Sequence, residues 1–179
     1  MDILKGLAKM KTLVLMIAPP GAGKSTLAMK LAKSGLFSDL NLIVSTDRIR
    51  ERLFGDETYQ GGNREVFETA YNDVEEALAF CDDVCVFVDA CNCTDQDRRK
   101  FTRFAIANPG TKIVGILYDG TVKECLDRNE RRERVVPRNV VLRFYDLIPH
   151  SMDQLLYENP EFDAIIPFSL AEEMTRKEI

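Results

Sequence analysis

Short apolar runs alternate along the chain with longer segments in which apolar residues recur every three or four positions. The apolar runs predict five strands, at residues 12–18, 41–47, 84–90, 112–119 and 163–168. The first three runs are almost continuously apolar, which is typical of strands buried on both faces of a sheet.

The segments between these runs have the apolar spacing of amphipathic helices. The spacing predicts helices at residues 25–36, 48–54, 67–81, 95–107 and 138–148, whereas the polar, glycine-rich segment 55–63 is predicted to be a loop. Segment 121–134 is predicted to begin as a helix and then becomes densely charged. Strands that alternate with helices predict an α/β fold, a five-stranded parallel sheet with helices on both faces. The length of 179 residues predicts a single domain, 1–179.

Three polar features directly follow predicted strands. A glycine-rich loop follows the first strand, Asp47 ends the second, and Asp89 lies at the end of the third. Ligands of parallel α/β sheets bind at the carboxyl ends of the strands. We therefore expect all three features to lie at one edge of the sheet.

The segment IAPPGAGKST, residues 17–26, is typical of a phosphate-binding loop except that Ala18 replaces the first glycine of the G-x-x-x-x-G-K-[ST] pattern. Alanine fits that position if its φ is negative, and the two prolines stiffen the loop. Backbone N–H groups of such a loop bind phosphate, the lysine bridges the terminal phosphates, and the hydroxyl after it ligates Mg²⁺. The predicted ATP site comprises Pro20, Gly21, Ala22, Gly23, Lys24, Ser25 and Thr26, with Ser25 as the Mg²⁺ ligand.

The acceptor side of a phosphotransferase needs a base for the attacking hydroxyl and cations for the transition state. Asp47 is the predicted base, and Arg50 shares its helical face three residues on. A helix cap is the structural alternative for Asp47. Asp89 is predicted to hold a Mg²⁺-bound water or to orient the acceptor.

Asn92 and Arg98 follow Asp89 in the next loop and helix. They are candidates for the acceptor site, with a turn residue and a surface charge as the respective alternatives. The pattern alone does not distinguish these two interpretations.

The segment RNERRER, residues 128–134, places four arginines among two glutamates, between a helix and Pro137. It predicts a short helix–loop–helix lid at about residues 127–138 whose arginines clamp the transferring phosphate. A solvated charged helix is the alternative interpretation.

Net charge, cysteine content and the length of the apolar runs limit the classes of protein to which the chain could belong. The net charge of −5 argues against general coating of nucleic acid but leaves room for a local basic site. The five cysteines lack zinc spacing, so we expect reduced and mostly buried thiols, as in a cytoplasmic protein. The longest apolar run near the start is too short to span a membrane.

Together, PPGAGKST, STDRIR, VDACN with the following DRR, and RNERRERVVP resemble the phage and bacterial polynucleotide 5′-kinases of the P-loop kinase group that includes zeta-toxin-like enzymes. The resemblance extends from about Thr12 to Phe168 and covers the kinase portion only. It implies an ATP- and Mg²⁺-dependent kinase of 5′-hydroxyl ends of DNA or RNA.

The resemblance also implies roles for individual residues. Asp47 would be the general base and Arg50 would contact the 3′-phosphate of the acceptor nucleotide, while Arg128 and Arg132 would contact the donor phosphates. The lid is one residue shorter than in a common version of the pattern, which leaves the choice among Arg131, Arg132 and Arg134 open. A small-molecule kinase of the same fold and a slow nucleotide-dependent switch are the competing hypotheses.

Overall fold

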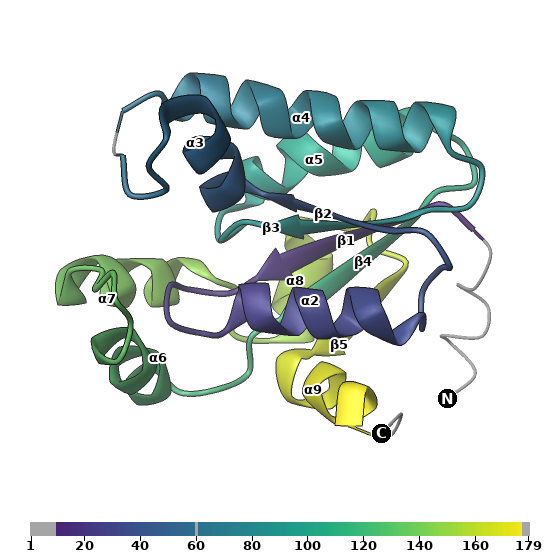
Figure 1. Cartoon of the computed structure of the whole chain (residues 1–179). Coiled ribbons are helices and arrows are strands. Elements are labelled where there is room, and N and C mark those ends of the chain that lie inside the picture. Colours follow the sequence, from purple (N-terminus) through teal and green to yellow (C-terminus); the bar gives the residue numbers. More distant parts are fainter. Residues whose placement is uncertain (1–9, 60, 177–179) are drawn as a thin grey trace.

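Five parallel strands form a single sheet at the centre of the protein (Figure 1). The computed structural model describes residues 10–59 and 61–176, so parts of the expected domain 1–179 lie outside the described residues. In chain order the strands are β1 (Thr12–Ile17), β2 (Asn41–Ser45), β3 (Cys85–Asp89), β4 (Lys112–Leu117) and β5 (Ala164–Pro167). Their order across the sheet is β2-β3-β1-β4-β5, which confirms the predicted parallel sheet.

Helices cover both faces of this sheet, as predicted (Figure 1). Helices α4 and α5 pack together on one face, and α2 and α9 pack together on the other. The described helices are α2 (Lys24–Ser34), α3 (Thr46–Phe54), α4 (Asn63–Phe80), α5 (Asp95–Ala107), α6 (Val122–Glu130), α7 (Arg138–Leu147), α8 (Met152–Glu158) and α9 (Phe168–Arg176). None of the helices in the described ranges is long and apolar enough to cross a membrane.

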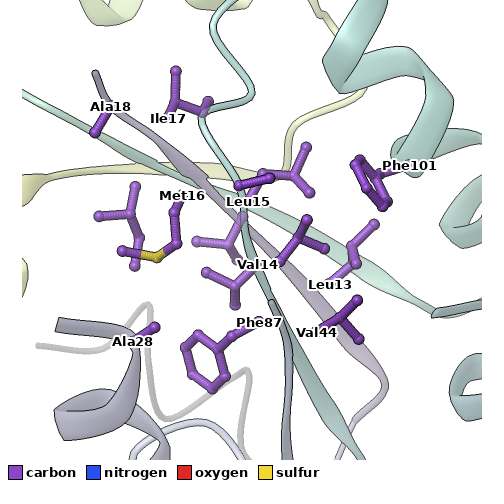
Figure 2. Packing of buried hydrophobic residues seen from close by; sticks show 14 of the residues in the cluster. Leu13, Val14, Leu15, Met16, Ile17, Ala18, Ala28, Val44, Phe87 and Phe101 are labelled. Atoms are coloured by element: carbon purple, nitrogen blue, oxygen red, sulfur yellow. The ribbon is translucent and has the colours of Figure 1, made fainter. Parts of the chain in front are cut away.

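The core is built around β1, the central strand, which is fully buried along its length. In Figure 2, Phe101 of α5 lies on one side of this strand and Ala28 of α2 lies on the other. Both faces of β1 therefore pack against side chains, which explains why its sequence is a continuous apolar run rather than an alternating one.

The structure corrects or refines three details of the sequence prediction. Strand β2, predicted to be buried, forms an edge of the sheet, and Leu42 is 37% exposed. Segment 121–134, predicted to begin as a helix, is helical as far as Glu130, after which the chain turns toward Pro137. Helices α8 and α9 were not predicted, since α8 has only seven residues and α9 directly follows β5 without a loop.

The carboxyl ends of the strands point toward the region enclosed by α3 on one side and α6 and α7 on the other (Figure 1). The phosphate loop follows β1 at this edge, and Asp47 lies in the first turn of α3, directly after β2. Asp89 ends β3 in register with Ser45 of β2. The sheet thus brings together the three polar features that the sequence placed after strands.

Candidate active site

A cavity of about 740 Å³ opens at this edge of the sheet. Residues of the phosphate loop, the start of α3, the end of β3 and the lid segment (residues 127–138) line it together. Its polar lining includes Lys24, Ser25, Thr26, Thr46, Asp47, Arg50, Asp89, Arg128, Arg132 and Arg134. Asn92, Arg98 and Arg131 do not line it.

The phosphate loop curls tightly at two glycines with left-handed backbone. Gly21 has a φ of 82° and Gly23 a φ of 95°, and Gly23 is also the N-cap of α2. Lys24 extends back along the loop, where its Nζ donates a hydrogen bond of 2.9 Å to the carbonyl oxygen of Pro19. The loop therefore has the form of a phosphate nest that ends at a helix N-terminus.

Ala18 occupies the first glycine position of the loop without backbone strain. Ala18 is fully buried, and its N–H donates to the carbonyl oxygen of Cys91 at 3.2 Å. The φ of Ala18 is not positive, because Asn92 is the one non-glycine residue with a positive φ among the described residues. Since no left-handed conformation is needed at Ala18, a side chain is tolerated there.

Asp47 and Arg50 face the cavity from one side of α3. Arg50 Nη1 donates to Asp47 Oδ1 at 3.0 Å, and Arg50 Nη2 donates to Asn63 Oδ1 at 3.0 Å. The Asp47 side chain makes no hydrogen bond that caps α3, and its Oδ2 has no hydrogen-bond partner within the described part of the chain. A carboxylate oxygen is therefore available to accept a proton from a hydroxyl in the cavity.

Ser25 and Asp89 are suited to hold Mg²⁺. Ser25 is exposed toward the cavity at the start of α2, and Asp89 is only 7% exposed yet lines the same cavity. Neither side chain has a hydrogen-bond or ion-pair partner in residues 10–59 and 61–176. A hydroxyl and an unpaired carboxylate are oxygen ligands of the kind that Mg²⁺ prefers, directly or through water.

Asn92 and Arg98 do not join the acceptor side. The amide nitrogen of Asn92 donates to the carbonyl oxygen of Met16 at 2.9 Å, so Asn92, 4% exposed, stabilises the turn after β3. Arg98 is fully buried, which corrects the surface-charge alternative. Its guanidinium binds the carbonyl oxygen of Cys93 at 2.7 Å, the side chain of Asn159 at 2.6 Å, and Glu158.

The lid segment has the expected helix–loop–helix form, and Asn129 shapes its loop. The Asn129 amide donates to the Val136 carbonyl oxygen at 2.7 Å and accepts from the Val136 N–H at 3.0 Å, which joins the two ends of the loop. Arg128 Nη1 donates to the carbonyl oxygen of Ala22 in the phosphate loop at 2.9 Å. Arg132 and Arg134 line the cavity, whereas Arg131 is exposed outside it.

Several cavity residues were not predicted from the sequence. Phe67 was expected only as part of the apolar face of α4, but it also lines the cavity on the Arg50 side. Val136, Val140 and Phe144 form an apolar wall at the lid and α7. Their spacing of four residues is a sequence signal that could have indicated a shared face.

Cys91 also lines the cavity without having been predicted to do so. A hydrogen bond from Cys93 and the nearby positive charge of Lys24 lower the pKa of the Cys91 thiol, and the same hydrogen bond together with burial raises the pKa of Cys93. All five cysteines are free, as expected, and three of them are buried.

The cavity is basic although the chain is acidic. Five basic side chains and two carboxylates line it, whereas the whole chain has a net charge of −5. A concave site with an excess of positive charge concentrates anionic ligands. The arrangement is therefore suited to bind a polyphosphate on the glycine-loop side and a second group next to Asp47.

Comparison with known proteins places the chain in a family and shows its fold. A protein-family model described as an AAA domain matches residues 13–148, which includes the phosphate loop, α3 and the lid segment. The chain belongs to this AAA-domain family. A search of curated proteins finds no significant sequence match.

Solved structures that are similar to this chain include kinases of RNA and of small molecules. The chain is similar to a structure of the Pnkp1/Rnl/Hen1 RNA repair complex, with 19% identity and a TM-score of 0.64 over 86% of this chain and 47% of that one. It is also similar to a fungal RNA kinase, with 16% identity and a TM-score of 0.61 over 93% of this chain and 42% of that one. The chain thus spans less than half of the length of these two proteins.

Shikimate kinase from Acinetobacter baumannii, solved in complex with shikimate, is similar over 97% of this chain and 96% of that one, with 20% identity and a TM-score of 0.55. At these identities the similarity establishes the fold alone. The protein has the α/β fold of P-loop kinases, a fold that implies nucleotide use.

Proposed function

We propose that the protein is an ATP-dependent polynucleotide 5′-kinase, which transfers the γ-phosphate of ATP to 5′-hydroxyl ends of DNA or RNA. The observation that carries the proposal is the Asp47–Arg50 pair, 3.0 Å apart, which lines the same cavity as the phosphate loop and the lid arginines. A carboxylate beside a guanidinium suits an acceptor that has both a hydroxyl and a phosphate. The RNA repair complex and the fungal RNA kinase, which have the same fold, support this choice.

In this proposal the residues that bind phosphate, act as the base and hold the metal have distinct roles. The nest at Gly21 and Gly23, together with Lys24, binds the donor phosphates, and Asp47 Oδ2 accepts the proton of the attacking hydroxyl. Arg128 and Arg132 neutralise charge on the transferring phosphoryl group from the lid side. Ser25 and Asp89 would hold Mg²⁺, which would neutralise the negative charge of the phosphates.

The alternative is a kinase of a small molecule, such as a sugar, a nucleotide or an antibiotic. The similarity to shikimate kinase over nearly the whole chain favours it as the second candidate. Such an enzyme would share the donor site and Asp47, but it would not need Arg50 to bind an acceptor phosphate.

Phosphate transfer from γ-labelled ATP, in the presence of Mg²⁺, to 5′-hydroxyl oligonucleotides of DNA and RNA tests the proposal. We expect labelled 5′ ends with the wild-type protein and a loss of about 100-fold or more in Asp47→Asn, the usual scale for removing a general base. Asp39→Asn is the matched control, since Asp39 is exposed and lies outside the cavity. Absence of transfer to either nucleic acid, with ATP bound, would refute the proposal.

A further inference from the structure

Arg134 differs from the other lid arginines in what it contacts. Its Nη1 donates to the carbonyl oxygen of Glu57 at 3.1 Å and lies 3.8 Å from Asp47 Oδ1. Glu57 belongs to the loop between α3 and α4, so both contacts are on the acceptor side of the cavity. Arg128, by contrast, contacts the phosphate loop. The lid segment therefore reaches the two sides of the cavity with two different arginines.

Two guanidinium groups consequently approach the same oxygen atom of Asp47, Oδ1. Arg50 approaches Oδ1 to 3.0 Å from α3, and Arg134 approaches it to 3.8 Å from the lid segment. Asp47 has one negative charge against these two positive charges, and the other carboxylate that interacts with Arg134, that of Asp56, is exposed in the loop before α4. The Arg50 Nε–H is also buried and has no hydrogen-bond partner among the described residues. A buried donor without a partner is costly, and an anion in the cavity beside Arg50 and Arg134 would balance the excess positive charge.

We propose that Arg134, which the lid segment contributes, is a specificity-determining residue that binds the acceptor phosphate beside Arg50. This inference rests on the proposed function and deepens it. The ligand class is a 5′-hydroxyl nucleoside with a 3′-phosphate or a 3′-phosphodiester. Because Arg134 belongs to the lid segment, acceptor binding and the position of the lid are coupled through this residue.

A purely mechanical role for Arg134 predicts different behaviour. If Arg134 only held the lid to the loop at Glu57, its removal would weaken turnover equally for all acceptors. If it bound the donor instead, as proposed for Arg128, its removal would raise the KM for ATP. A phosphate subsite predicts a selective rise in the KM of acceptors that have a 3′-phosphate.

The test compares Arg134→Ala, Arg134→Lys and Arg131→Ala with thymidine 3′-phosphate and thymidine as acceptors at saturating ATP. Arg131→Ala is the matched control because Arg131 lies in the same loop but outside the cavity. In Arg134→Ala we expect the KM for thymidine 3′-phosphate to rise about 10- to 100-fold, the range for losing a charge-assisted hydrogen bond. Thymidine, which lacks the phosphate, should change less than about threefold, and Arg134→Lys should recover part of the loss.

Calorimetric binding of thymidine 3′-phosphate without ATP tests the subsite independently of turnover. We expect Arg134→Ala to weaken this binding and Arg131→Ala to leave it unchanged, with both variants melting as the wild type does. Equal binding by Arg134→Ala and the wild type, or a rise confined to the KM for ATP, would overturn the subsite. If the wild-type protein binds this ligand through Arg134 but transfers no phosphate to nucleic acid, the subsite stands and the proposed function fails.

Discussion

Gly21 is the residue at which the phosphate loop meets the first helix of the lid segment. Its φ of 82° belongs to the left-handed region, and a Cβ at this position would lie 2.2 Å from the carbonyl oxygen of Cys125 in α6. Both backbone conformation and close approach therefore require glycine. Since Cys125 is buried within α6, the obstructing atom cannot move aside easily.

Gly21→Ala should lower both stability and nucleotide affinity. The left-handed backbone alone costs about 1–2 kcal/mol for a side-chain-bearing residue, and the clash with α6 adds roughly 1–3 kcal/mol. Gly35→Ala is the matched control, because Gly35 has a φ of 67° but nothing within 4 Å of an added Cβ. Thermal melting should show a larger decrease in Tm for Gly21→Ala than for Gly35→Ala, and titration with ATP should show weaker binding only for Gly21→Ala. Equal decreases would contradict the close approach.

At the scale of elements, Arg98 connects three parts of the chain. Its fully buried guanidinium on α5 binds carbonyl oxygens of the loop after β3, the side chain of Glu158 on α8, and Asn159 directly after it. The short helix α8 is thereby held against α5. The loop that it stabilises includes Cys91, so Arg98 supports one wall of the cavity without lining it.

Arg98→Ala should destabilise the protein by roughly 3–5 kcal/mol, because it empties a fully buried site and leaves buried acceptors such as Asn159 Oδ1 without a donor. For a chain of this length, that corresponds to a decrease in Tm of at least about 6 °C. Arg64→Ala provides the control, since Arg64 forms an exposed pair with Glu68 and its loss should leave Tm nearly unchanged. Melting curves followed by circular dichroism provide the measurement, and similar Tm values for both variants would show that the buried network is not stabilising.

At the scale of the whole molecule, the acidic chain encloses a basic cavity between the sheet edge and the lid segment. Lys24, Arg128 and Arg132 reach this cavity from the phosphate loop and from a segment about 100 residues further along the chain. A nucleotide that contacts both parts would bind the folded state and not the unfolded chain. Ligand binding should therefore be visible as stabilisation of the entire fold.

We expect ATP with Mg²⁺ at about 100 times its Kd to stabilise the protein by about 2.7 kcal/mol, and thus to raise Tm by roughly 5–11 °C. Lys24→Ala should lose most of this increase because Lys24 would contact the donor phosphates. Lys30→Ala, an exposed change on the same helix, should retain it. A Tm shift that is the same in Lys24→Ala and the wild type, measured by calorimetry, would remove Lys24 from the nucleotide site.

The sequence alone determined the features that depend on neighbouring residues. Continuous apolar runs predicted β1 and β3 as buried strands, because strands buried on both faces admit few polar residues. The glycine loop and the position of Asp47 and Asp89 after strands followed from short patterns whose geometry is local. These features were sufficient to locate the cavity at one edge of the sheet.

Only the tertiary structure decided which side chains meet across the sheet edge. It placed β2 at the edge, buried Arg98 against α8, turned the amide of Asn92 inward, and brought Arg132 and Arg134, but not Arg131, to the cavity. These outcomes depend on contacts between segments far apart in the chain, so no local pattern contains them. The direction of a charged side chain is set by the partner that satisfies it, and here those partners, such as Glu57 for Arg134, lie on other elements.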